Sequence, residues 1–230
     1  MNQIALIAAL PGELKPLVHS WTHHRRNGID VWRKTIGRTE WIAVCAGAGR
    51  EAAKRAFHEA RLAAKFSRVY SVGFAGALRP EFQPGTACAV SGIIDTATGE
   101  RFTAAGPVAS CVLLTHHRVA DRPEKAQLAA THAGDLVDME AAEVARQALA
   151  QGIEFRCVKG VSDGCTDRLP DLNRFITPAG HFQLARFVGF AALRPQLWPG
   201  LIRLGRNSRR AAEALAAYLQ VAIDAEPRRL

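Results

Sequence analysis

This 230-residue sequence lacks the features that mark disulfide-rich, zinc-binding and membrane-spanning proteins. Its five cysteines are scattered and form no CxxC pair, so neither a disulfide framework nor a zinc site is indicated and a reducing cytosol is favoured. The apolar stretch at residues 3–10 is too short to span a bilayer and no basic region precedes it, so we expect a buried strand there. We therefore expect a cytoplasmic protein.

Positive charge is what the sequence has in excess, with 30 Lys and Arg against 21 Asp and Glu and a formal net charge of +9. Such charge favours anionic partners, whether phosphate, nucleic acid or acidic lipid, but a basic surface without any partner fits equally well. Because 48% of the residues are apolar, one sizeable core can form. We expect a single α/β core over residues 1–167, with a helical, basic extension over residues 168–230 packed on it.

Short apolar strands alternate with helices along the core, which predicts a mostly parallel sheet covered on both faces. The expected strands are residues 3–9, 31–36, 41–45, 69–72, 87–94, 111–115 and 155–161. The expected helices are residues 13–20, the Ala-rich stretch after Gly49 that ends near Lys65, and residues 123–130 and 138–150.

Three polar or Gly-rich segments directly follow expected strands: Leu10 to Glu13, Gly73 to Gly76, and Ser162-Asp163. Ligands of such sheets bind at the carboxyl ends of the strands. We therefore expect these segments to meet in one crevice.

Taken singly, each candidate residue also has an ordinary structural explanation. Glu13 at a helix start could serve only the helix dipole, and Asp163 could cap the next segment. The Gly47–Arg50 stretch could bind an anion or form a tight turn with a solvated arginine. Met139 could be core filling.

Taken in order, the segments resemble the nucleoside phosphorylase and nucleosidase superfamily, particularly the branch that includes methylthioadenosine/S-adenosylhomocysteine nucleosidase. The resemblance covers roughly residues 3–167 and is most specific at Val-Asp-Met-Glu-Ala-Ala (137–142) and Val-Lys-Gly-Val-Ser-Asp (158–163). Further parts are the opening at residues 4–10 with Glu13, Gly-Ala-Gly at 47–49, residues 72–78, and Pro-Gly-Thr at 84–86. The resemblance implies a single-domain phosphorylase/nucleosidase-like α/β/α sandwich with a mixed, mostly parallel central sheet.

The resemblance also implies the reaction, which is cleavage of the N-glycosidic bond of a purine nucleoside. The departing base gains negative charge and the sugar gains positive charge, so the enzyme has to protonate the base and stabilise an oxocarbenium-like centre. By resemblance Asp163 donates a proton to N7 of the purine and Ser162 orients it. That role needs a raised carboxyl pKa, which desolvation at an apolar strand end could supply.

The same resemblance assigns the sugar and the nucleophile. Glu140, expected on the helix, binds the ribose hydroxyls, and Met139 packs against the sugar beside Asp138. Glu13 positions and activates the attacking water, and Lys159 stands where the branch has an arginine. The family needs neither a metal nor an organic cofactor.

Departures from the family pattern leave the nucleophile open. Phe74, after Gly73, replaces a serine whose hydroxyl helps to hold water or phosphate. Arg50 and Lys159, with Gly49, could still form a phosphate or water site, so inorganic phosphate remains an alternative co-substrate. Val119 aligns with an aromatic residue that stacks on the base, where it would leave only an aliphatic contact.

The C-terminal extension interleaves aromatic and aliphatic residues with arginines, which suits a membrane interface. A helix pair packed on the sheet with an Arg-rich outer face is the alternative interpretation. The whole pattern resembles the hopanoid-associated phosphorylases, for which removal of adenine from adenosylhopane is proposed. That resemblance implies a 5′-substituted adenosine as substrate, a homo-oligomer, and peripheral contact with the inner face of the membrane.

Other functions compete with this hypothesis. A methylthioadenosine/S-adenosylhomocysteine nucleosidase or a purine nucleoside phosphorylase is the nearest alternative. A nucleosidase-like core without activity, acting as a basic binding module, is another, although we expect no nucleic-acid partner. A Rossmann enzyme is set aside, because Ala52 stands at the third glycine of Gly-x-Gly-x-x-Gly and no acidic residue follows a second strand suitably.

Overall fold

The structure is a computed structural model that describes residues 2–106 and 111–226. Its strands are β1 (Asn2–Ala8), β2 (Thr22–Arg26), β3 (Ile29–Ile36), β4 (Thr39–Cys45), β5 (Arg68–Ala77), β6 (Ala87–Val90), β7 (Gly92–Asp95), β8 (Arg101–Thr103), β9 (Val112–Thr115), β10 (Leu136–Asp138) and β11 (Glu154–Asp163). Its helices are α1 (Pro11–Val18), α2 (Arg50–Ala63), α3 (Arg122–Thr131), α4 (Ala141–Ala150), α5 (Leu184–Ala192) and α6 (Trp198–Asp224), with 3-10 turns at Leu172–Phe175 and Pro195–Leu197.

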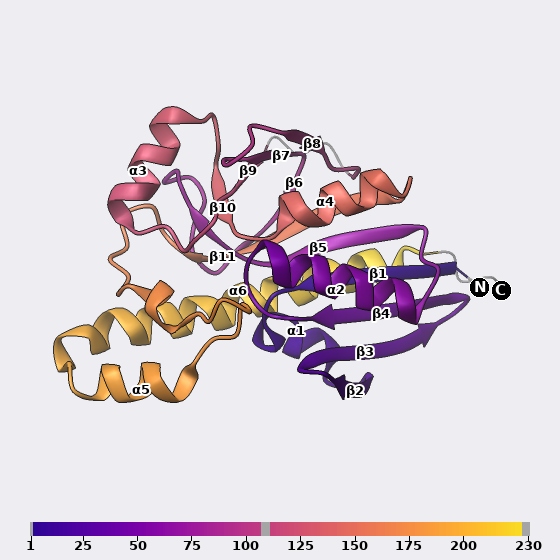
Figure 1. Ribbon diagram of the computed structural model, residues 1–230, viewed down its shortest axis with the longest axis horizontal. Helices are drawn as coiled ribbons and strands as arrows, with labels where there is room; N and C mark the ends of the chain where they lie inside the picture. The colour runs from indigo at the N-terminus through magenta and orange to yellow at the C-terminus, as the bar shows by residue number, and fades with distance from the viewer. Residues whose placement is uncertain (1, 107–110, 227–230) are drawn as a thin grey trace.

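The strands form one mixed sheet in the order β2-β3-β4-β1-β5-β10-β9-β7-β8, with β11 paired to β5 and β6 paired to β11. β1 runs parallel to β4 and β5, and β11 runs parallel to β5. Antiparallel pairing holds the outer strands β2-β3-β4 and β7-β8 and joins β10 to β5. Helices lie on both sides of the sheet (Figure 1), so the predicted fold class, a single-domain α/β/α sandwich with a mixed sheet, is confirmed.

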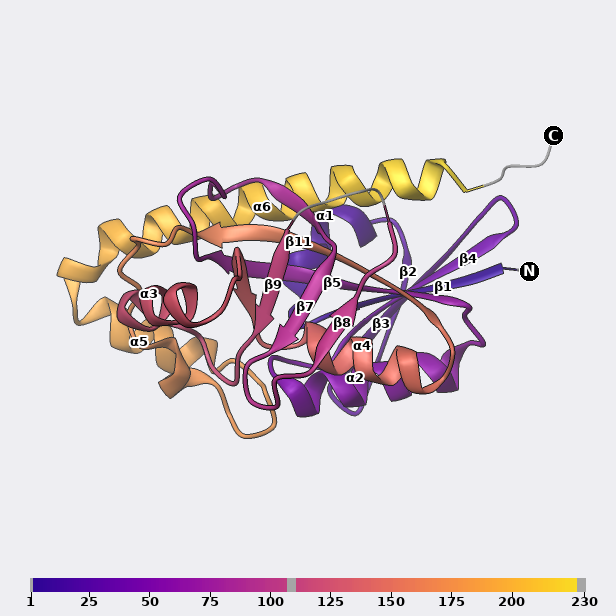
Figure 2. The same ribbon diagram turned by 90° about the horizontal axis from the view of Figure 1, so that it is seen from above.

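The core lies on both faces of the sheet because side chains alternate along each strand. On β1, Ala5 and Ile7 belong to the cluster that α2 and α4 cover. Ile4 and Leu6 belong to the opposite cluster, which α1 and α6 cover. Figure 2 shows α6 on one side of the strands and α2 with α4 on the other.

β5 changes its partner along its length, and this opens the sheet. Its first half pairs with β1 as far as Ser71, whereas Gly76 and Ala77 pair with β10. On that edge the residues in between have no ladder partner among the described strands, and the N–H of Phe74 binds a side chain instead. The ends of β1 and β10 therefore flank a split at the middle of β5, a position where ligands enter α/β sheets.

Several expected boundaries are wrong. β5 continues to Ala77 and does not end at Val72, and the expected strand 87–94 divides at Ser91 into β6 and β7. Residues 136–138 form a strand and α4 begins at Ala141, because the Asp138 carboxylate accepts a hydrogen bond from the Ala141 N–H. β2 and β8 were not expected. β2 is an exposed edge strand that pairs only with β3, and its polar sequence has no apolar pattern that would predict a strand.

The C-terminal segment, residues 168–226, contains α5 and the 27-residue helix α6. The second half of α6 buries a stripe with a four-residue repeat, Ala211, Leu215, Leu219 and Ile223, against the sheet. By contrast, no residue between 181 and 210 is buried. Within the part of the chain that the structure describes, none of the helices combines the length and apolarity needed to cross a membrane.

Candidate active site

A cavity of about 320 Å³ lies at the split in the sheet. Leu10 and Glu13, residues 74–76, and Ser162 with Asp163 all line it. The three segments that follow expected strands therefore meet in one place. Glu140, Met139, Asp138 and Val119 line the same cavity.

Glu13 is held rigidly at the cavity wall. Its Oε2 accepts hydrogen bonds from the N–H groups of Ala9 and Leu10 at 2.9 and 2.8 Å, and its Oε1 accepts one from Phe74 at 2.9 Å. Burial raises the pKa of Glu13, although these hydrogen bonds partly oppose the shift. Gly73 has a φ of +130°, and a Cβ there would lie 2.9 Å from both carboxylate oxygens, so only glycine lets Glu13 approach.

Asp163 is paired with a lysine that sequence reasoning did not identify. The Lys125 ammonium, 2% exposed, forms an ion pair with Oδ2 of Asp163 and donates a hydrogen bond to the Gly164 carbonyl at 2.8 Å. The Ser162 hydroxyl donates a hydrogen bond to Oδ1 of Asp163 at 2.6 Å, and its orienting role stays a prediction. The environment of Asp163 is therefore not simply apolar, because an ammonium group and a hydroxyl group hold its carboxylate.

Lys125 carried a signal in the sequence that could have been used. It lies three residues before Leu128, and these are the two residues that α3 buries. Residues three apart share one face of a helix. A lysine on the apolar face of a predicted helix is a candidate for pairing with a buried carboxylate.

Glu140 lies directly before α4 and not on it, which corrects the expected helix boundary. Its Oε1 accepts a hydrogen bond from the Gly49 N–H at 2.7 Å, and its Oε2 accepts one from the Met139 N–H at 3.2 Å. Burial, followed by the nearby Asp138 carboxylate, raises the pKa of Glu140. The carboxylate remains at the cavity, where it can accept hydrogen bonds from hydroxyl groups.

Asp138 and Lys159 form a buried ion pair at 2.9 Å beneath the cavity. Asp138 also accepts hydrogen bonds from Thr115 Oγ1 at 2.7 Å and from the Ala141 N–H at 2.9 Å, so its oxygens are occupied by the protein. Burial opposes the charge of Lys159, but Asp138 outweighs this effect and raises the lysine pKa. The ion pair joins β11 to the end of β10. Asp138 lines the cavity, whereas Lys159 does not.

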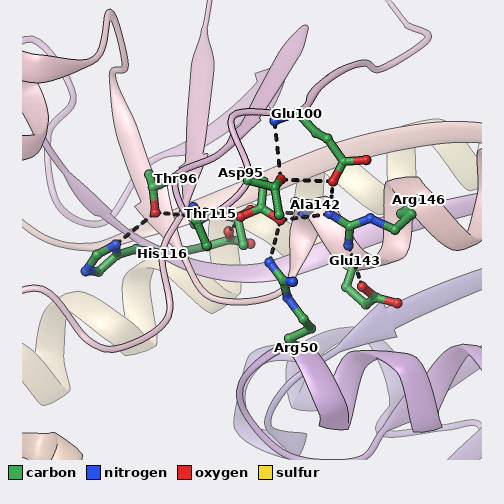
Figure 3. A network of polar contacts seen from close by, with 12 residues as sticks. Arg50, Asp95, Thr96, Glu100, Thr115, His116, Ala142, Glu143 and Arg146 are labelled. Atoms are coloured by element: carbon green, nitrogen blue, oxygen red, sulfur yellow. Dashed lines mark hydrogen bonds and ion pairs between the residues drawn. The ribbon is translucent and has the colours of Figure 1, made fainter.

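The three residues predicted to hold phosphate are separate from one another and bound to other groups. Arg50 donates to the buried Asp95 at 2.5 Å, and Arg146 binds the same carboxylate at 2.8 Å (Figure 3). Burial raises the pKa of Asp95, but Arg146 and Arg50 are among the groups that outweigh it and lower the pKa. The Gly49 N–H donates a hydrogen bond to Glu140, and Lys159 forms an ion pair with Asp138. None of the three residues lines the cavity, and their phosphate-binding role stays a prediction.

The remaining wall of the cavity is apolar and comes from the C-terminal segment. Its apolar side chains are Leu169, Leu172, Ile176, Phe182, Phe187 and Leu204, and Ser208 is the one polar residue of the described segment that lines the cavity. The Phe74 side chain and Val119 line the cavity as well. The sequence indicated an apolar segment here but not which of its residues turn inward.

Hydrogen bonds hold this segment against the core near the cavity. The Asn173 side chain accepts a hydrogen bond from the Val119 N–H at 2.9 Å and donates one to its carbonyl at 3.0 Å. The Ala48 N–H donates to the Gly180 carbonyl at 2.8 Å. A Cβ on Gly47 would lie 2.7 Å from that carbonyl oxygen, so the glycine-rich turn serves close backbone approach.

Comparison with known proteins agrees with this geometry. Residues 3–111 match the sequence model of the phosphorylase superfamily. The match confirms the resemblance seen in the sequence. None of the proteins with curated functions matches the chain.

Solved structures of this superfamily share the fold. A Helicobacter pylori methylthioadenosine nucleosidase variant, with 5′-methylthioadenosine in its active site, superposes with a TM-score of 0.73 at 13% identity and covers 97% of this chain and 99% of its own. Futalosine hydrolase of Helicobacter pylori gives 0.73 at 13% identity, covering 97% of both chains. The Streptococcus pyogenes S-adenosylhomocysteine nucleosidase, in complex with 5-methylthiotubericidin, gives 0.72 at 18% identity and 98% of both.

Proposed function

We propose that this protein cleaves the N-glycosidic bond of an adenine nucleoside that carries a large apolar substituent on C5′, such as adenosylhopane, and releases adenine. The observation that carries the proposal is one cavity in which Glu13, Glu140 and Asp163 face a wall of leucine and phenylalanine side chains. The match of residues 3–111 to the phosphorylase superfamily and the fold shared with solved nucleosidases support the reaction type. The apolar wall supports the size of the substituent.

Each carboxylate has a distinct task in this proposal. As the N9–C1′ bond breaks, the electron pair moves to the purine and the Asp163–Lys125 pair supplies the proton that reaches N7. Glu140 accepts hydrogen bonds from the ribose hydroxyls and stabilises the cationic sugar. Glu13 accepts a proton of the water whose oxygen bonds to C1′, so the products are adenine and the 5′-substituted ribose.

Water is the nucleophile that the cavity favours. Among the described residues that line it, the two cations Lys125 and Arg118 are already paired, with Asp163 and Glu124 respectively. Phosphate would need at least one of these ion pairs, or that of Arg50, to rearrange. The fixed carboxylate of Glu13 is better placed to activate a neutral water than to receive a second anion.

Adenine release provides the test. Purified protein is incubated with adenosylhopane, methylthioadenosine and adenosine, each with and without inorganic phosphate, and adenine is measured by chromatography. We expect the highest kcat/KM with the hopanoid and rates that do not depend on phosphate. Brisk cleavage of methylthioadenosine without turnover of the hopanoid would contradict the proposed substituent, and strict phosphate dependence would contradict water as nucleophile.

A further inference from the structure

The outer surface of the C-terminal segment carries large apolar side chains that nothing in the described chain covers. Five lie between residues 184 and 202 and are 49% to 81% exposed. We call them the docking surface: Leu184, Val188, Leu193, Trp198 and Ile202. In Figure 1, α5 and the first turns of α6 lie at the end of the molecule away from the start of β1.

Of these side chains, Trp198 also holds the segment together, since its Nε1 donates a hydrogen bond to the Ala191 carbonyl at 2.9 Å. The inner face of α5 packs through Phe187 and Phe190, whose rings lie 5.4 and 5.2 Å from that of Phe175. Leu184 and Val188, four residues apart on the same helix, are instead 63% and 55% exposed. The segment therefore has one apolar face that packs inward and a second that faces outward.

The charge around the docking surface has a single sign. No aspartate or glutamate occurs between Asp171 and Glu213. Over the same stretch the sequence has seven arginines, namely Arg174, Arg186, Arg194, Arg203, Arg206, Arg209 and Arg210. Exposed apolar side chains surrounded by cations, with tryptophan among them, complement an interface of acyl chains and anionic headgroups.

The docking surface and the cavity share the helices α5 and α6. Phe187 lies on the inner face of α5 and Leu204 on α6, and both line the cavity, while Val188 and Ile202 on the same helices face outward. A hydrophobic substituent that leaves a bilayer at this surface would meet apolar side chains on the way in. An aqueous path would expose it to water instead.

We propose that the docking surface binds the surface of an anionic lipid bilayer and that a lipid-linked nucleoside enters the cavity between α5 and α6. The second part rests on the proposed function, whereas binding to the bilayer does not. α5 lies in the headgroup region with its outer face toward the acyl chains, and the arginines contact the headgroups.

Vesicle flotation tests this binding. The full-length protein is mixed with vesicles of phosphatidylcholine alone or with phosphatidylglycerol added, and the double variant Val188→Glu/Leu193→Glu is compared with wild type. The matched control is Leu62→Glu/Leu149→Glu, which alters residues that are 69% and 73% exposed on α2 and α4. We expect wild type and control to float with anionic vesicles, the docking variant to lose binding by at least about tenfold, and binding to weaken with salt.

Three results would overturn the docking surface. They are failure of the wild type to float, equal loss in the two double variants, or a wild-type oligomer that dissociates in light scattering when Val188 and Leu193 are changed and that never binds vesicles. Adenine release from soluble adenosine, measured without vesicles, separates this inference from the proposed function. An active protein that does not float contradicts bilayer binding and leaves the proposed function intact. A floating protein that cleaves no nucleoside contradicts the proposed function, and with it the entry route, but leaves bilayer binding intact.

Discussion

The two walls of the cavity differ in chemistry and in how firmly they are held. The wall formed by strand ends carries Glu13 and Asp163, each fixed by backbone N–H groups or a buried ammonium. The wall formed by the C-terminal segment is apolar, and residues 181–210 contain no buried residue. Near the cavity, Asn173 and Gly180 form hydrogen bonds that hold this wall against the core.

This difference indicates that one wall of the cavity determines the reaction and the other determines which substrate is accepted. Charges that stabilise a transition state have to be oriented beforehand, which needs the rigid frame of the sheet. Apolar contact is non-directional, so a segment of lower local stability can supply it. The sheet should therefore set the reaction, and the C-terminal segment should set the substituent that is accepted.

The largest effect should follow from Asp163→Asn. Without the carboxylate, adenine release should fall about 10³-fold for adenosine and for 5′-substituted nucleosides alike, because the proton donor is lost for every substrate. Lys125 would also lose its buried partner, so the free energy of unfolding should drop by about 3–5 kcal/mol. Initial rates and urea denaturation measure the two effects.

A double variant separates the loss of activity from the loss of stability. Asp163→Asn/Lys125→Met removes both charges, so most of the stability should return while activity stays low. Turnover by Asp163→Asn within about tenfold of wild type would remove Asp163 from the reaction.

The strand-end wall was largely predictable from sequence, and the reasons are local. Glu13 lies in the first turn of α1, shortly after β1, and Asp163 is the last residue of β11, so the rule for strand ends places both at the cavity. Asp138 was placed on a helix because a three-residue strand shows no periodicity. Lys125 was missed because lysines in helices usually face water.

The C-terminal segment was predictable only as a type of surface. Phe187 and Val188 are neighbours in an apolar, arginine-containing stretch, yet one lines the cavity and the other is 55% exposed. Composition cannot distinguish the two faces when both are apolar, because the helical period gives a direction only where apolar and polar residues alternate. Tertiary contacts, such as those of Asn173, decide which face turns inward.

Phe187→Ala should discriminate between substrates. Removing the ring from the apolar wall should lower kcat/KM for adenosylhopane in detergent micelles by about 30-fold and leave adenosine within about twofold. Val188→Ala is the matched control, since it alters the adjacent residue on the outward face. Equal losses for both substrates would show that Phe187 supports the site as a whole.

Glu140→Gln should change the pH dependence of stability. Burial and Asp138 raise the pKa of Glu140 from 4.5 to about 8 in the folded state. A raised pKa gives stability that is present below the unfolded pKa and is lost as the pH rises through the folded pKa. The glutamine cannot ionise, so the variant should gain up to about 1.4 kcal/mol relative to wild type for each pH unit between these values. Thermal unfolding as a function of pH measures this, and parallel curves would contradict it.

Arg50→Gln should have the smallest effect, because the Arg50 side chain is bound outside the cavity. Asp95 keeps its contact with Arg146 at 2.8 Å, so the free energy of unfolding should fall by only about 1 kcal/mol. Adenine release should stay within about twofold of wild type with and without phosphate. If phosphate accelerates the wild type but not Arg50→Gln, the arginine must leave Asp95 to bind the anion, and the strand-end wall would then be less rigid than its contacts indicate.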